Sequence, residues 1–87
     1  MTVYEKIVTN IIDREVFDLA RQMLSKFISK VDIKMDPIKS DHYDYVGFEA
    51  SFTVDGKHWK VCGLVDDCGR VSLGDLICDD KLIYKFY

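Results

Sequence analysis

Four residues in the C-terminal half have side chains that could bind a metal ion or act as nucleophile and base. They are His58, Cys62, Cys68 and Cys78. A tetrahedral zinc site holds its ligand atoms ~2.0–2.3 Å from one ion. Along an extended strand rising ~3.3 Å per residue, Cys62 lies ~13 Å from His58 and ~20 Å from Cys68. The spacing therefore predicts no metal site, no disulfide and no Cys–His catalytic pair, so we expect no cofactor and no enzymatic activity.

Carboxylates and tyrosines cluster at one predicted end of the fold. This acidic end consists of Asp41, Tyr43, Asp44, Tyr45, Asp66 and Asp67. If Tyr45 pairs with Asp66, the loop at 41–45 and the turn at 66–69 lie side by side. Aspartate is common in turns, which would explain the cluster without any binding role. The functional alternative is a docking site for another protein with a basic surface, with the tyrosines as anchors.

A second candidate surface is the sheet face turned away from the predicted helix. Small and apolar residues occupy its centre: Gly47, Cys62, Leu64, Gly74, Leu76 and Ile83. An uncovered sheet face normally carries long, charged side chains, so this composition favours a covering partner, a second copy or the chain's own N-terminal segment. Simple exposure remains the alternative, because apolar surface is common.

The elements that position these residues begin with a helical region at 2–30. Apolar residues recur at intervals of three and four from Ile12 onward. Thr2 and Glu5 match a capping box. A β-branched stretch before Asp13 predicts a break near 10–13, followed by a main helix at about 13–30. Residues 31–37 are expected to form a short strand or linker, and residues 38–44 a polar loop.

Residues 45–87 predict a four-stranded antiparallel meander. Asp55-Gly56 is a strong hairpin signal. The turns at 67–69 and 79–80 place Val65 opposite Val71, Ile77 opposite Leu82, and Asp75 opposite Tyr84. One face then collects a common apolar set: Val46, Phe48, Phe52, Trp59, Val61, Val71, Leu73 and Phe86. Agreement among three separate turns supports this register.

Asp75 is the exception to the apolar pattern of the inward face. A bulge at Gly74-Asp75 would turn its carboxylate outward. If Asp75 instead stays inside, it needs a hydrogen-bond partner, and the hydroxyl of Tyr84 is the candidate.

These elements predict a single α+β domain at 1–87, with the helix packed on one face of the meander. The element order resembles the cystatin-like arrangement and single repeats of helix-plus-sheet inhibitor domains. The cystatin Gln-x-Val-x-Gly hairpin is absent, and the turn at 54–57 reads Val-Asp-Gly-Lys. Protease inhibition is therefore not implied by the resemblance.

Composition narrows the class further. With 48% hydrophobic residues the chain is not disordered, and no apolar run is long enough to span a membrane. The N-terminus lacks the features of a secretory signal. Residues 41–87 contain nine acidic and five basic side chains, which disfavours nucleic-acid binding. An odd number of cysteines suits a reducing compartment, so we expect a cytoplasmic protein.

The sequence as a whole favours a small acidic domain that works by binding another protein, as an inhibitor or adaptor. Inhibitors encoded by phages or mobile elements, such as anti-CRISPR-like proteins, are a typical setting for such domains. One alternative is a homodimer or larger homo-oligomer that uses the outer sheet face. Another is a ligand-binding or catalytic domain with a cavity between helix and sheet.

Overall fold

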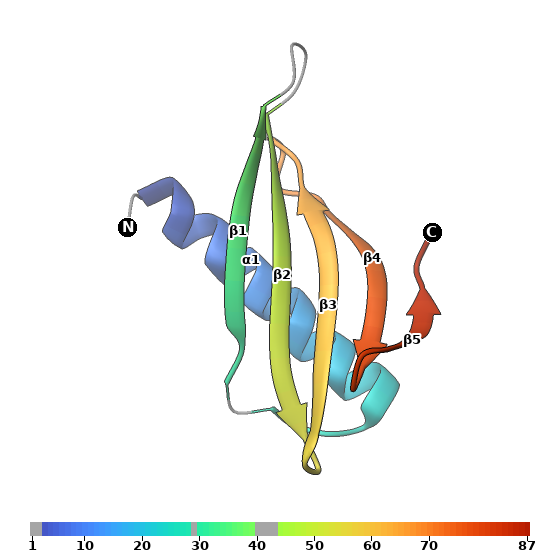
Figure 1. Ribbon diagram of the computed structural model, residues 1–87. Coiled ribbons are helices and arrows are strands. Elements are labelled where there is room, and N and C mark those ends of the chain that lie inside the picture. Colours follow the sequence, from blue (N-terminus) through green and yellow to red (C-terminus); the bar gives the residue numbers. More distant parts are fainter. Residues whose placement is uncertain (1–2, 29, 40–43) are drawn as a thin grey trace.

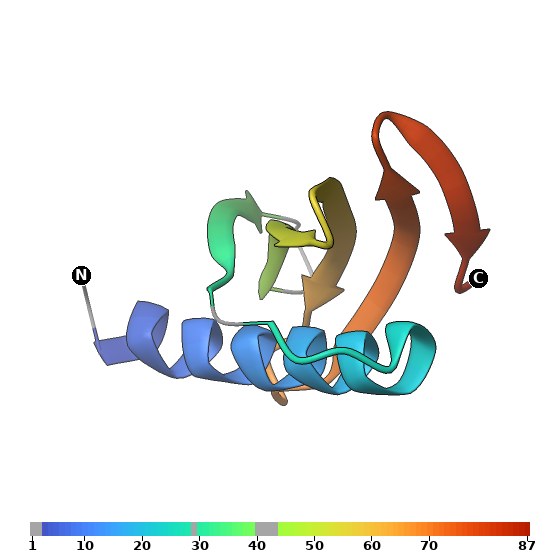
Figure 2. The same ribbon diagram turned by 90° about the horizontal axis from the view of Figure 1, so that it is seen from below.

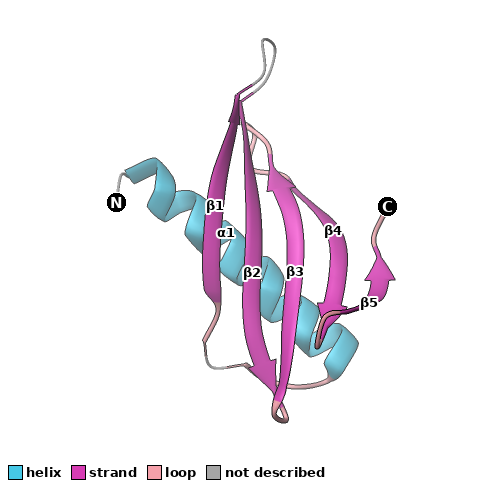
Figure 3. Cartoon of the chain, viewed as in Figure 1, coloured by secondary structure: helices cyan, strands magenta, loops and turns pink. Residues whose placement is uncertain are grey.

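The computed structural model describes residues 3–28, 30–39 and 44–87, and among these it leaves the side chains of residues 4, 37–39 and 44 undescribed. The chain begins with helix α1 (Val3–Leu19), which continues into a π-helical turn, η1 (Ala20–Leu24). Five strands follow (Figure 1, Figure 3): β1 (Asp32–Lys39), β2 (Asp44–Val54), β3 (Lys57–Val65), β4 (Val71–Cys78) and β5 (Lys81–Lys85).

The strands form one antiparallel sheet in the order β1-β2-β3-β4-β5, and α1 crosses one of its faces (Figure 2). The predicted α+β class and antiparallel sheet are confirmed. The predicted count of four strands is wrong, because β1 pairs with β2 from Asp32 opposite Ser51 to Lys39 opposite Asp44. Pro37 is compatible with this strand because β1 is an edge, where a missing N–H costs no ladder bond. The cystatin-like topology is not confirmed.

Helix α1 runs without interruption through 10–13, so the predicted break is wrong. Val8, Ile12 and Val16 are buried in the core, and this packing outweighs the weak helix propensity of β-branched residues. The helical region ends before residue 30: Ser25 adopts the left-handed conformation (φ 53°), and its N–H donates to the carbonyl of Ala20. The predicted capping box includes Thr2, which lies outside the described residues.

The predicted hairpin registers hold for β2 and β3 along their whole length, and for β3 and β4 next to the turn. Phe48 lies opposite Gly63, and Val65 opposite Val71. The predicted inward face is confirmed as the sheet side of the core. Four of its members are buried, Val46, Phe48, Phe52 and Val61, and four are partly buried against them, Trp59, Val71, Leu73 and Phe86.

A bulge interrupts the β3–β4 pairing where the sequence predicts one. Gly63 pairs with Leu73 and Val61 with Leu76, so Gly74 and Asp75 together lie opposite Cys62. The extra residue reverses the facing of β4 beyond this point. Leu76 (1% exposed) and Cys78 (8%) therefore belong to the buried side. The predicted place of Leu76 on the outer face is wrong.

A second irregularity lies between β4 and β5. Ile77 pairs with Leu82 as predicted, but Leu76 pairs with Tyr84, which leaves Ile83 as the extra residue. Asp75 consequently lies opposite Lys85. Tyr84 is therefore not the partner of Asp75. The hydroxyl of Tyr87 donates to Asp75 Oδ1 over 3.1 Å instead.

None of the helices in the described part of the chain combines the length and hydropathy needed to cross a bilayer.

The contact between Gly63 and Phe48 yields a prediction about stability. A Cβ at position 63 would lie 2.6 Å from Phe48 Cζ and 2.7 Å from the carbonyl oxygen of Ser72. The ring can shift, but the carbonyl belongs to the β4 backbone. Gly63→Ala should therefore lower the free energy of unfolding by about 1–3 kcal/mol, measured by urea denaturation.

Gly74→Ala is the matched control, because its new Cβ would meet only the carbonyl group of Cys62, with the oxygen at 3.4 Å and the carbon at 3.9 Å. It should cost less than ~1 kcal/mol. Unchanged stability of Gly63→Ala would contradict the close packing of Phe48 on Gly63.

Candidate functional site

The structure locates only part of the predicted acidic end. Asp41 and Tyr43 lie outside the described residues, and Asp44 is placed only by its backbone, as the first residue of β2. Tyr45 is half-buried at the start of the same strand. The clustering of all six residues thus stays a prediction, and the described part of the acidic end consists of Tyr45, Asp66 and Asp67.

Asp66 organises the turn between β3 and β4. Its Oδ1 accepts the backbone N–H of Cys68 (2.9 Å) and of Arg70 (2.8 Å), while its carbonyl accepts the N–H of Gly69 (3.1 Å). Its own N–H donates to the carbonyl of Arg70 (3.0 Å). Asp66 therefore performs the turn chemistry that aspartate favours.

Asp66, Asp67 and Cys68 place three potential metal-ligating atoms within 4.8 Å of one another. The two carboxylates raise the pKa of the Cys68 thiol, with Asp67 contributing more than Asp66. A protonated thiol is a poor nucleophile and a poor metal ligand. The role that the structure shows for Asp66 in this cluster is that of organising the turn.

The outer sheet face is more charged than the sequence predicts. Lys60 and Glu49 form an ion pair across it (3.2 Å), and the hydrogen bond to Glu49 raises the pKa of Lys60. Lys30 and Asp32 form another pair (3.6 Å). Burial, followed by the charge of Glu49, raises the pKa of the Cys62 thiol, so this cysteine is not an activated nucleophile.

The six residues predicted for this face do not form one patch. Gly47, Cys62 and Leu64 lie on it, and Gly74 sits in the bulge opposite Cys62. Leu76 is in the core, and Ile83 lies on β5 beyond the second bulge. Of the six, Leu64 is the large apolar side chain that stays on the face, and the reversal of β4 adds Ile77, which pairs with Lys60 and lines the hollow described next.

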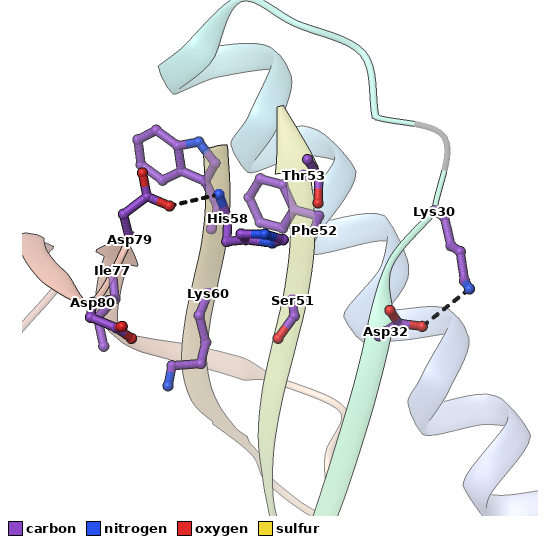
Figure 4. Close-up of a pocket in the computed structure, with 11 residues that line it drawn as sticks. Lys30, Asp32, Ser51, Phe52, Thr53, His58, Lys60, Ile77, Asp79 and Asp80 are labelled. Atoms are coloured by element: carbon purple, nitrogen blue, oxygen red, sulfur yellow. Dashed lines mark hydrogen bonds and ion pairs between the residues drawn. The ribbon is translucent and has the colours of Figure 1, made fainter. Parts of the chain in front are cut away.

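A hollow of about 580 Å³ lies on the outer face near the 55–56 and 79–80 turns. Figure 4 shows Ser51 and Lys60 along it, the Lys30–Asp32 pair at one side and Asp79 and Asp80 at the other. Asp79 Oδ1 accepts the backbone N–H of His58 (3.0 Å), so this carboxylate braces the two turns. Among these residues we find no convergent acid–base pair. A second hollow of about 400 Å³ surrounds Gly47 and Cys62.

Among the described residues, the longest consecutive run of exposed large apolar side chains lies on β5, and the sequence analysis singled out only Ile83 from it. All five residues of β5 are exposed. Leu82 (52% exposed), Ile83 (53%) and Tyr84 (49%) are consecutive, and Tyr87 (79%) follows the strand. Tyr84 makes an edge-on contact with Phe86, with ring centres 4.9 Å apart. The run Lys-Leu-Ile-Tyr-Lys at 81–85 could have indicated this surface. The predicted register, however, pairs Leu82 with Ile77 on the inward face of the sheet.

Comparison with known protein families, curated proteins and solved structures found no match for this chain. Any functional interpretation therefore depends on the residues and surfaces described above.

The contacts of Asp66 predict that it matters for stability and Asp67 does not. Asp66→Ala removes the acceptor of two backbone N–H groups and should cost about 0.5–2 kcal/mol of unfolding free energy, as a lost cap does. Asp67→Ala, at an exposed neighbouring position, should stay within about 0.5 kcal/mol of the parent chain. Urea denaturation of both variants measures the difference. Equal costs would show that Asp66 does not organise the turn.

The three cysteines are free thiols with different exposure, and this predicts an order of alkylation. Exposed Cys68 should react before half-buried Cys62, and buried Cys78 only on unfolding. Because Asp67 raises the pKa of Cys68, Asp67→Asn should increase its thiolate fraction and speed its labelling at pH 7–8. The gain should disappear at a pH well above the pKa. Mass spectrometry of timed iodoacetamide reactions measures both effects, and a rate unaffected by Asp67→Asn would contradict the turn geometry.

Proposed function

We propose that this chain is a non-enzymatic protein-binding module, working as an inhibitor or adaptor in the cytoplasm, and that it binds through β5. One observation carries the proposal: β5 is an edge strand whose five residues are all exposed, three of them large, apolar and consecutive. Contiguous exposed apolar residues are typical of interaction sites. Three free thiols are compatible with a reducing compartment.

The site chemistry favours binding over catalysis. The thiols of Cys62 and Cys68 both have raised pKa values, so neither is poised as a nucleophile. The carboxylates of Asp66 and Asp79 accept backbone N–H groups at turns. The two thiols are thus mainly protonated near neutral pH, and the two carboxylates are hydrogen-bonded to the backbone of turns.

The β5 surface is also a stronger candidate than the two surfaces predicted from sequence. Leu76 is in the core and the outer face carries the Glu49–Lys60 ion pair, so that face is less suited to apolar docking. A homo-oligomer that uses it would depend on Leu64. Docking of a basic partner at the acidic end stays a prediction, with Asp67 as its exposed described residue.

Capture experiments with matched variants test the proposal. The double variant Leu82→Thr and Ile83→Thr keeps β-propensity but removes apolar surface, whereas Leu64→Thr does the same on the outer face. Both should keep the thermal stability of the parent chain, since all three side chains are exposed. Immobilised parent chain and Leu64→Thr should retain a partner from extracts of the source cells, and the β5 variant should retain at least tenfold less.

Two results would contradict the proposal. Retention by the β5 variant equal to that of the parent chain would remove β5 from the binding surface. Loss of retention in Leu64→Thr alone, or a stable dimer in sedimentation that Leu64→Thr dissociates, would move the interface to the outer sheet face.

A further inference from the structure

The end of the helical region departs from the apolar pattern of its own sequence. Ile12 and Val16 are fully buried, and in an unbroken α-helix Met23 and Phe27 would share their face, because residues seven and eleven apart lie on one side. In the structure, Met23 is instead 44% exposed and Phe27 89% exposed. Phe27 is the most exposed large apolar side chain in the part of the chain that the structure describes.

The cause of this departure is the π-helical turn η1. The hydrogen bond from the N–H of Ser25 to the carbonyl of Ala20 spans five residues instead of four, so the end of the helix is rotated relative to α1. Leu24 consequently packs against the core in place of Met23, and Ile28, beyond the turn, is buried. The turn thus decides which apolar side chains are buried and which are exposed.

The path of the chain explains why the helix stops where it does. The end of the helix lies beside β4, whereas β1, the next element, is the edge strand three places away (Figure 1, Figure 2). Three strand spacings amount to about 14 Å. A helix continued through Ile28 would move its end about 6 Å farther beyond β4 and leave four Cα–Cα steps to Asp32, which reach about 14 Å at most. Within one copy, a continuous helix is therefore incompatible with the position of β1.

The turn that stops the helix has a cost of its own. Ser25 adopts the left-handed conformation (φ 53°), which is unfavourable for residues with a Cβ. A left-handed non-glycine residue, a π-helical turn and an exposed aromatic ring therefore coincide within residues 20–27. A single change, the straightening of the chain at Ser25, would remove all three.

We propose that two copies of this chain exchange their α1 helices, with Ser25 as the hinge. The straightened helix of each copy packs on the sheet of the other, and Met23 and Phe27 replace Leu24 and Ile28 against the core. The short connection to β1 no longer limits the helix, because the helix and the sheet it covers belong to different copies. The remaining core contacts are those of the monomer, which makes such an exchange a low-cost route to a dimer. This self-association is separate from partner binding through β5.

Refolding of the full chain at high and at low concentration tests the exchange. Refolding at high concentration should yield a dimer that sedimentation still detects after dilution, because the return to monomer requires α1 to leave the core. In a dimer refolded from isotope-labelled and unlabelled chains, filtered NMR spectra should show contacts between core side chains of different copies, such as Val16 and Leu76. A dimer that forms through an exposed surface keeps these contacts within one copy.

Substitutions at the hinge should change the balance in opposite directions. Glycine adopts the left-handed conformation without steric cost and disfavours a continuous helix, so Ser25→Gly should favour the monomer. Because each dimer contains two hinges, its dissociation constant should rise about tenfold or more. Ser25→Ala keeps the cost of the left-handed turn and raises helix propensity, so it should lower the dissociation constant.

Phe27→Ser and Ile7→Ser form a matched pair at exposed apolar positions of the exchanged segment. Both should keep the thermal stability of the monomer. Only Phe27 becomes buried in the exchanged dimer, so Phe27→Ser should raise the dissociation constant about tenfold or more, and Ile7→Ser should leave it unchanged.

A chain that stays monomeric after refolding at high concentration would overturn the inference. A dimer without core contacts between copies would do the same, as would a dissociation constant that Ser25→Gly leaves unchanged. None of these results bears on the proposed function, which is judged by the loss of partner capture on Leu82→Thr and Ile83→Thr.

Discussion

The bulge of Gly74 and Asp75 opposite Cys62 is the constraint on which the rest of the structure depends. Side chains of a strand alternate between its two faces, so one extra residue reverses every position beyond it. Before the bulge, β4 turns Val71 and Leu73 toward the helix. Beyond it, Leu76 and Cys78 take the inward positions, and Leu76 becomes one of the most deeply buried side chains. Without the bulge, the carboxylate of Asp75 would occupy an inward position opposite Val61, where burial of an unpaired charge is costly.

The second irregularity, at Ile83, determines how β5 leaves the fold. Bulges increase the local twist of a strand pair, and Figure 2 shows β5 curving away from the part of the sheet that α1 crosses. Beyond the strand, Phe86 is anchored by its backbone N–H, which donates to the carbonyl of Gly74 (2.9 Å), and its side chain packs against the core. The strand is thus held at both ends, by the turn at 79–80 and by Phe86, while its own side chains stay in solvent. The exposed side chains of β5 are therefore carried by a strand whose position in the fold is fixed.

The sequence predicts the hairpins well because each register depends on a local turn signal and on one face being apolar. Asp55-Gly56 fixes the β2–β3 pairing to the last residue, and the misplaced carboxylate at Asp75 reveals the bulge. The bulge also buries Leu76, and a second bulge forms at Ile83. Both depend on packing between residues that are distant in the sequence, so a local pattern does not predict them. The helix break is wrong because burial of Ile12 outweighs local propensity. Of the two alternatives for 31–37 the strand is correct, but its pairing with β2, which makes it a fifth strand of the sheet and extends it to Lys39, is not visible in the local pattern. The run of exposed apolar residues on β5 is missed because exposure is a property of the complete fold.

The buried core and the exposed strand β5 draw on different parts of the chain. The buried cluster draws on α1, η1, β2, β3 and β4 and on Ile28, and from the C-terminal segment only Phe86 packs against it. Substitutions within 81–85 therefore remove little buried area, and selection can change this strand without unfolding the domain. A protein of 87 residues has few positions that escape the demands of its core. Because the exposed apolar run of β5 lies outside the buried cluster, the domain can carry it without giving up any of the positions that its core requires.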